Sequence, residues 1–198
     1  MTLWLAQPPV GWWPLAWVAP IGWLMIAKRD AATDGPLSRR DWLCVYASGV
    51  VYWAAACHWV CLPHPATPVG WVFLSLYLGL YPTAFVWLTR VATRRAHAPL
   101  WLAAPLLWVG IECLQARLFS GFLMGALSHS QPCALFGEKI ASLVGAYGVS
   151  AFLVFLMSQA VRVVELKTHA TSRMLLAASI MISLAWFFFA GVWSYRPP

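Results

Sequence analysis

The chain has 198 residues, of which 62% are hydrophobic and only 10% are charged. Soluble globular domains carry roughly 25% charged residues, so this composition excludes an ordinary soluble domain and predicts an integral membrane protein. The formal net charge is +7, but the basic residues lie in short loops between apolar runs, which is typical of membrane topology determinants and not of a nucleic-acid interface.

Taken in chain order, the apolar runs predict an all-α membrane protein with a bundle of about six transmembrane helices. A short helical stub, residues 3–6, comes first. The six predicted spans are residues 14–27, 42–62, 69–89, 100–116, 140–161 and 174–195. A spanning helix needs about 20 apolar residues, and the first span is shorter than this and should be kinked at Pro20. No linker or repeat interrupts the chain, so we expect one polytopic membrane domain over residues 1–198.

The stretch after the fourth span has a different character. It contains Ser120, Gly121 and Phe122 and then a short apolar piece that ends in the polar residues 128–131. This piece is too brief to cross a membrane as a helix of its own. We predict a re-entrant or interfacial segment, which is tolerated at membrane depth only where protein or water satisfies its backbone.

The loops divide the basic residues unequally between the two sides of the membrane. Ten of the thirteen fall on one side of six alternating helices, which leaves Arg117, Lys139 and Arg196 on the other. By the positive-inside rule the side with ten is cytoplasmic. This predicts a multi-pass protein whose C-terminus emerges on the outer face, and a first helix that is missing or shortened.

Glu112 is the one acidic residue well inside a predicted span. A carboxylate near the bilayer centre costs about 3 kcal/mol, so it should face a protein interior or a wet cavity and have a partner. A structural hydrogen bond and a direct ligand contact are both open. Arg117 lies about 140° away around a regular helix, so pairing with it requires a break near Ala116; Tyr147 and Ser150 of the next span are alternative partners.

A second group of polar residues lies near the outer end of the second span, at Cys57, His58, Cys61 and His64. Thiolate and imidazole ligands can hold zinc, but this spacing fits no familiar site, and we predict neither a metal nor another cofactor. The five cysteines are odd in number and give no disulfide framework.

Four stretches of the chain resemble the N-terminal membrane domain of bacterial apolipoprotein N-acyltransferases. They are QPPVGWWPLAW, LSLYLGLYPTAFVWLTR, LLWVGIECLQARLFSGF and VGAYGVSAFLV. The third is the most specific, because it carries matches to the family pattern at Trp108, Glu112, Leu114, Arg117, Gly121 and Phe122, followed by Ser130 and Gln131. The chain departs from the family pattern at Gln115, Leu123, Met124 and His129.

The resemblance implies a place in the bacterial inner membrane, with the C-terminus in the periplasm, and a role in lipoprotein biosynthesis. Phospholipid would be the acyl donor, and the amino group of a diacylglyceryl-cysteine lipoprotein the acceptor. The residues we single out as substrate-binding or cavity-lining candidates are Glu112, Arg117, Gly121, Phe122, Gln131 and Trp13.

The family also has a periplasmic nitrilase-like domain, whose Glu, Lys and Cys form a thioester acyl-enzyme. The sequence ends at Pro198, where that domain would begin. We therefore expect no catalytic residue in this chain and no acyltransferase activity from it alone, and a separately encoded nitrilase-like domain is an expected partner. The alternative is a catalytically silent membrane protein that binds lipid or scaffolds a partner. A small transporter ranks third, since Glu112 is a lone ionisable residue.

Overall fold

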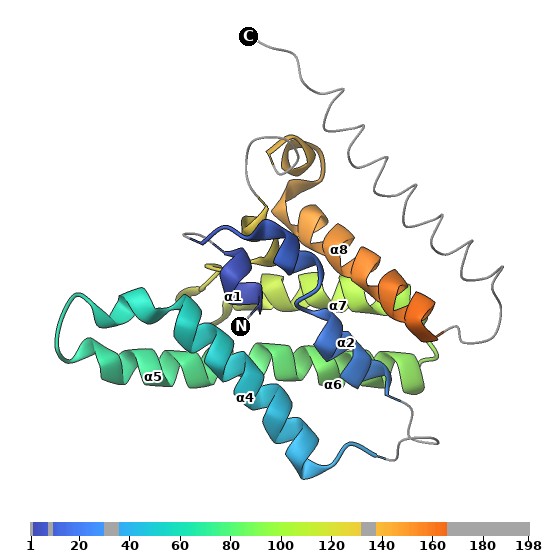
Figure 1. Cartoon of the computed structure of the whole chain (residues 1–198), viewed down its shortest axis with the longest axis horizontal. Helices are drawn as coiled ribbons and strands as arrows, with labels where there is room; N and C mark the ends of the chain where they lie inside the picture. The colour runs from blue at the N-terminus through green and yellow to red at the C-terminus, as the bar shows by residue number, and fades with distance from the viewer. Residues whose placement is uncertain (1, 8–9, 30–35, 132–137, 166–198) are drawn as a thin grey trace, which may run out of the picture.

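The computed structural model describes residues 2–7, 10–29, 36–131 and 138–165 (Figure 1). Every regular element in these ranges is helical, as the sequence predicts. The α-helices are α1 (Thr2–Ala6), α2 (Ile21–Lys28), α4 (Arg39–Ala56), α5 (Thr67–Leu78), α6 (Leu80–Arg94), α7 (Leu100–Gln115) and α8 (Glu138–Glu165). The short 3₁₀ helices are η1 (Trp13–Trp17), η2 (His58–Cys61), η3 (Leu118–Ser120) and η4 (Leu127–Ser130).

Two stretches of the described residues are long and apolar enough to cross a membrane, Thr67–Arg94 and Val144–Val163. The first joins α5 and α6, which lie end to end in Figure 1, and covers the predicted span 69–89. The second is the part of α8 around and after Gly145, where a φ of 72° interrupts the helix. α7 is apolar but only 16 residues long. The predicted span 174–195 lies outside the described residues.

The apolar opening of the chain folds as separate short helices. α1 matches the predicted stub, and Pro14 enters the first turn of η1. α2 then begins at Ile21, with Pro20 as its N-cap residue. Because proline lacks an N–H and clashes with the preceding turn, Pro20 starts a new helix here, where the sequence predicted a kink within a single one.

Aromatic side chains from three helices form the centre of the bundle. α7 packs against both α6 and α8, and α2 packs against the same two helices. Trp108 of α7 stacks on Trp23 of α2, with ring centroids 6.2 Å apart, and meets Phe85 of α6 edge-on at 4.9 Å. These contacts hold the short α2 against the longer helices.

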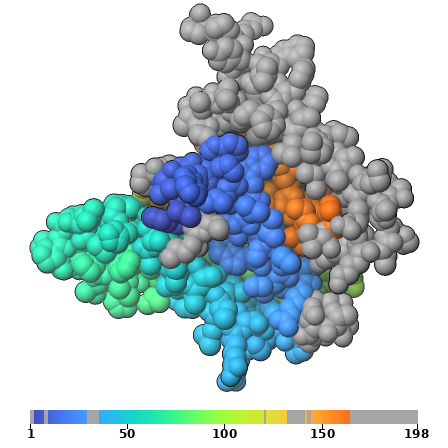
Figure 2. Space-filling model, viewed as in Figure 1, coloured from blue at the N-terminus to red at the C-terminus, as the bar shows by residue number. Residues whose placement is uncertain are grey.

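Small residues let α4 approach the junction of α5 and α6 closely. A Cβ atom added at Gly49 would lie 3.0 Å from the carbonyl oxygen of Gly79. The close approach of the two backbones therefore depends on a residue without a side chain at position 49. Beyond the junction, α5 and the chain before it project from one side of the molecule (Figure 2).

Basic residues hold together one end of the bundle. Arg90 of α6 is 8% exposed, and its Nη1 donates hydrogen bonds to the carbonyl oxygens of Ile26 (2.8 Å), Ala27 (3.3 Å) and Arg29 (3.1 Å). Arg94 donates to the Arg29 carbonyl as well. Carbonyl groups at a helix C-terminus lack partners within the helix and carry partial negative charge. Arg90 therefore caps α2 and joins it to α6.

The N-terminus of α4 lies at this same end. The hydroxyl of Ser38 accepts a hydrogen bond from the backbone N–H of Asp41 (3.2 Å). The Asp41 carboxylate accepts one from the backbone N–H of Ser38 (2.8 Å), and the two bonds together form a capping box. The backbone N–H of Ser38 is the main cause that lowers the pKa of Asp41, whose Oδ1 also lies 3.5 Å from Nη1 of Arg29. Burial and then the charge of Arg162 on α8 lower the pKa of Lys28. Cations from α2, α6 and α8 thus gather at one end, which we call the basic end.

Candidate functional site

The buried carboxylate of Glu112 lies near the C-terminus of α7, at the opposite end from the basic residues. The side chain is 5% exposed. Its Oε1 accepts from the indole Nε1 of Trp108 (2.9 Å), the backbone N of Leu127 (2.9 Å) and the hydroxyl of Ser150 (3.1 Å). Ser150 is one of the two partners that the sequence analysis proposed. One oxygen atom therefore joins α7, the chain that follows it and α8.

The chain after α7, residues 116–131, is called the return segment below. It is not a continuous helix, because η3 and η4 are separated by irregular backbone with a turn at Met124 and Gly125. Gly121 has a φ of 80°, and a Cβ atom there would lie 2.3 Å from the carbonyl oxygen of Ala116. The N–H of Phe122 donates to the carbonyl of Gln115 (3.0 Å), and the Gln115 side chain donates to the carbonyl of Phe122 (2.8 Å). Polar groups at the turn that ends α7 thus find their hydrogen-bond partners within the protein.

Two buried side chains from distant parts of the sequence hold the middle of the return segment. Nε2 of Gln7 donates to the carbonyl of Ala126 at 3.3 Å, and the hydroxyl of Tyr52 donates to the carbonyl of Gly125 at 3.4 Å. Gln7 is 6% exposed and Tyr52 is 4% exposed. Buried carbonyl groups need hydrogen-bond partners. Gln7 and Tyr52 supply them to carbonyls of the return segment, so its backbone can be non-helical in an apolar interior.

The end of the return segment is fixed against η1. Oε1 of Gln131, which is buried, accepts from the indole Nε1 of Trp17 at 3.2 Å, and its Nε2 donates to the hydroxyl of Ser130 at 3.0 Å. Trp17 meets Trp13 edge-on, with ring centroids 6.5 Å apart. Trp13 is partly exposed and reaches the return segment through Trp17.

The six candidates from the sequence thus occupy different positions. Four of them belong to the hydrogen-bonded framework of the return segment: Glu112, Gly121, Phe122 and Gln131. Trp13 contacts Trp17, which in turn donates a hydrogen bond to Gln131. Arg117 is exposed at the end of α7, and the donors that reach Glu112 come from other residues.

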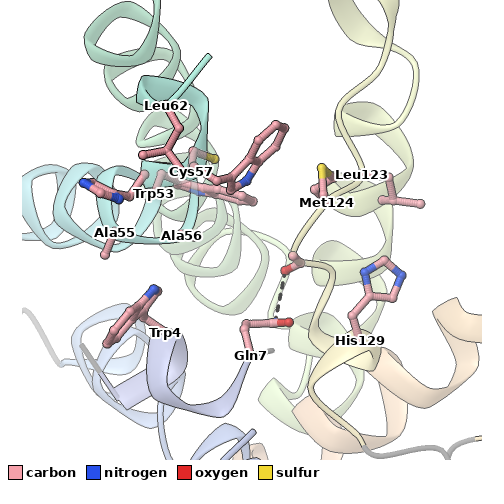
Figure 3. A pocket seen from close by; sticks show the side chains of 13 residues that line it. Trp4, Gln7, Trp53, Ala55, Ala56, Cys57, Leu62, Leu123, Met124 and His129 are labelled. Atoms are coloured by element: carbon pink, nitrogen blue, oxygen red, sulfur yellow. Dashed lines mark hydrogen bonds between the residues drawn. The ribbon is translucent and has the colours of Figure 1, made fainter. Parts of the chain in front are cut away.

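A cavity of about 900 Å³ opens between the C-terminal end of α4 and the return segment. In Figure 3, Trp53 and Leu62 lie on one side of it and Met124 and His129 on the other, with the hydrogen bond of Gln7 to the return segment at its base. Most of the lining is apolar. Glu112 instead lines a smaller inner cavity of about 40 Å³, which shares Trp53 and Gly125 with the open one.

The cysteine and histidine group near the end of α4 forms part of the open cavity. Cys57 and His58 line it. Nδ1 of His64 accepts from the backbone N–H of Ala66 at 3.1 Å. Among the residues that the structure describes, no three His, Cys, Asp or Glu side chains gather as metal ligands would.

Sequence reasoning did not single out Gln7, Tyr52 or Trp53. Gln7 carried a usable signal, since it is a polar side chain in an otherwise apolar opening. Trp53 carried none, because it is one of fourteen tryptophans, most of which resemble interfacial anchors.

Comparison with known proteins supports the motif resemblance. Residues 1–159 match the model of the apolipoprotein N-acyltransferase N-terminal domain. Similar proteins include apolipoprotein N-acyltransferases from Rhodopirellula baltica, 30% identical over 78% of this chain and 28% of the relative, and from Geobacter metallireducens, 31% identical over 72% and 29%. A third, from Gloeobacter violaceus, is 29% identical over 98% of this chain and 37% of the relative.

The chain therefore spans between 28% and 37% of the length of these relatives. The family model covers most of the chain, and its region contains the return segment, Glu112 and both cavities. The chain belongs to the apolipoprotein N-acyltransferase N-terminal domain family.

Proposed function

We propose that this chain is the membrane-embedded part of a phospholipid-dependent N-acyltransferase of bacterial lipoprotein maturation. The complete reaction would move an acyl chain from phospholipid to the amino group of an N-terminal diacylglyceryl-cysteine. Membership of the family supports the reaction class. The part that we assign to this chain is to hold the lipid donor, and a nitrilase-like domain would supply the covalent chemistry.

The observation that carries this assignment is the open cavity of about 900 Å³. Ligand sites typically measure about 300–1,000 Å³ and combine apolar walls with a few polar groups. Here the apolar wall includes Trp53, Leu62 and Met124, and the polar groups include Gln7 and His129. This composition suits an acyl chain inside the cavity and a lipid headgroup at its edge.

We also propose the arrangement of the whole chain in the inner membrane. It would be one domain over residues 1–198 with six spans, the basic end in the cytoplasm, and residues 116–131 as a re-entrant segment near the outer surface. Clustering of cations from α2, α6 and α8 at one end supports this orientation. Glu112, Gly121, Phe122 and Gln131 would then shape the outer wall, and Arg117 and Trp13 would face lipid headgroups.

Lipid binding is the first test of this function. Ala56 lines the open cavity, so Ala56→Trp is expected to fill it and to lower the amount of bound phosphatidylethanolamine about tenfold, a loss of roughly 1.4 kcal/mol. Native mass spectrometry of the detergent-purified chain would count the bound lipid. Ala47→Trp, at an exposed position of the same helix, is the matched control and should leave binding unchanged. Equal binding by both variants would remove the cavity as the lipid site.

Orientation is the second test. In a cysteine-free background, Ala96→Cys next to α6 should react with an impermeant thiol reagent only from the cytoplasmic side. Leu62→Cys, which replaces a 75% exposed side chain at the other end of the bundle, should react only from the periplasmic side. Labelling of both cysteines from one side would contradict the proposed orientation.

A catalytically silent lipid-binding or scaffolding protein would pass both tests. An activity assay distinguishes the two functions: this chain, together with a nitrilase-like domain, is incubated with phospholipid and a diacylated lipopeptide. Triacylated product supports the acyltransferase, whereas bound lipid without product supports the silent protein.

A further inference from the structure

Trp53 stands between the two cavities of the bundle. Both Trp53 and Gly125 line the open cavity of about 900 Å³, and both also line the inner cavity of about 40 Å³ that contains Glu112. Trp53 is 5% exposed. At the outer rim of the open cavity, by contrast, Trp59 is 49% exposed and Leu62 is 75% exposed. Along α4 and η2 the lining of the open cavity thus runs from the exposed Leu62 to the buried Trp53, and the Trp53 end is called its closed end below.

The indole of Trp53 is held firmly at this closed end. Its ring lies 5.0 Å from that of Tyr52 and meets the ring of Phe122 edge-on at 6.1 Å. A Cβ atom added at Gly125 would lie 3.3 Å from two carbon atoms of the indole, so the backbone of the return segment touches the ring. Contacts from α4 and from the return segment thus meet at Trp53, which lines both cavities.

The polar atoms at this position indicate that the indole acts through its shape. Within the described part of the chain, Nε1 of Trp53 is buried without a hydrogen-bond partner. A buried indole N–H usually has such a partner, so a hydrogen bond does not explain a tryptophan here. On the inner side, Oε2 of Glu112 is also buried and unpartnered in the described residues. An apolar chain that advanced past Trp53 would meet this carboxylate.

We propose that Trp53 sets the depth of the open cavity and so determines which acyl-chain length the protein prefers. This rests on the proposed function, namely that the open cavity holds an acyl chain of phospholipid. The terminal methyl group of the preferred chain would stop against the indole, and longer chains would leave methylene groups outside the apolar wall. Trp53 is a specificity-determining residue in this arrangement, and it takes no part in the chemistry.

The test measures chain-length preference with the purified 198-residue chain. It is mixed with equal amounts of phosphatidylethanolamines that carry short, medium and long saturated chains, and native mass spectrometry reports which are bound. Trp53→Ala should move the preference toward longer chains, by about fourfold in relative affinity for each methylene group that the enlarged cavity accepts. Trp53→Leu, which retains more apolar bulk and serves if the alanine variant does not fold, should move it the same way by less.

Two matched variants separate depth from general loss of the site. Trp53→Phe keeps an aromatic ring at the closed end and should keep the natural preference. Trp59→Ala removes the same residue type at the exposed end of the lining and should weaken all chain lengths alike. Retained binding with an unchanged preference in both Trp53→Ala and Trp53→Leu would overturn the proposal. Failure of the unmodified chain to bind any of the lipids would instead overturn the proposed function on which it rests.

Discussion

Glu112→Leu is expected to destabilise the protein by about 3 kcal/mol or more, because each buried donor that loses its acceptor costs about 1–3 kcal/mol. Three donors depend on this one oxygen: the indole of Trp108, the backbone N–H of Leu127 and the hydroxyl of Ser150. Replacing a complete buried ionic group by apolar residues can be neutral or stabilising, but removing one partner leaves the others unsatisfied. The loss should therefore outweigh the gain from burying leucine. Unfolding in detergent, followed by circular dichroism, would measure it.

Glu112→Gln is the matched control for this prediction. The amide keeps the shape of the side chain and an acceptor oxygen, so it should retain most of the stability. Ser150→Ala removes one of the three donors and leaves one backbone N–H, that of Ser128, without its acceptor, so it should cost less than the leucine variant. A side chain that faces lipid is expected to gain stability when it is replaced by leucine. Higher stability of the Glu112→Leu variant would therefore contradict the buried hydrogen-bond network around Glu112.

Gly121→Ala is expected to lower stability by at least about 2 kcal/mol, since a non-glycine residue held in a rare backbone conformation costs of order 1–3 kcal/mol and the added methyl group also collides. At Gly121 the φ is 80°, and the Cβ would lie 2.3 Å from the carbonyl oxygen of Ala116. Relief of that contact requires the turn to open, which separates Gln115 from Phe122. Lipid binding should fall with stability, because the turn begins the segment that forms one wall of the open cavity. Unfolding and native mass spectrometry would measure the two effects.

Gly110→Ala serves as the control for a glycine-to-alanine change near the same place. Gly110 lies within α7, and a Cβ atom there would have no atom within 4 Å apart from those of its chain neighbours and of the adjacent helix backbone. Alanine favours a helix interior over glycine by up to about 1 kcal/mol, so this variant should be as stable as the unmodified protein or more so. Equal stability losses at positions 110 and 121 would show that the turn carries no special constraint.

The sequence alone was enough to predict the helical fold and the family of the protein. Composition and apolar run length are properties of local stretches, and they predicted apolar helices, two of which are long enough to cross a membrane in the described residues. Glu112 could be recognised because a carboxylate in an apolar run is costly in any fold. A break after α7 could be predicted because the piece that follows is too brief to cross a membrane as a helix of its own. The motif order pointed to the family that the comparisons then established.

The tertiary structure decided which residues meet, because those contacts join parts of the chain that no local pattern relates. Gln7 holds Ala126 from 119 positions away, and Arg90 caps a helix that ends more than sixty residues before it. Whether Pro20 kinks a helix or starts a new one depended on how the flanking short helices could pack. Trp53 became distinct from the other tryptophans only when α4 and the return segment closed around it. Packing selects one such arrangement among many with the same apolar content, which is why it lies beyond local sequence reasoning.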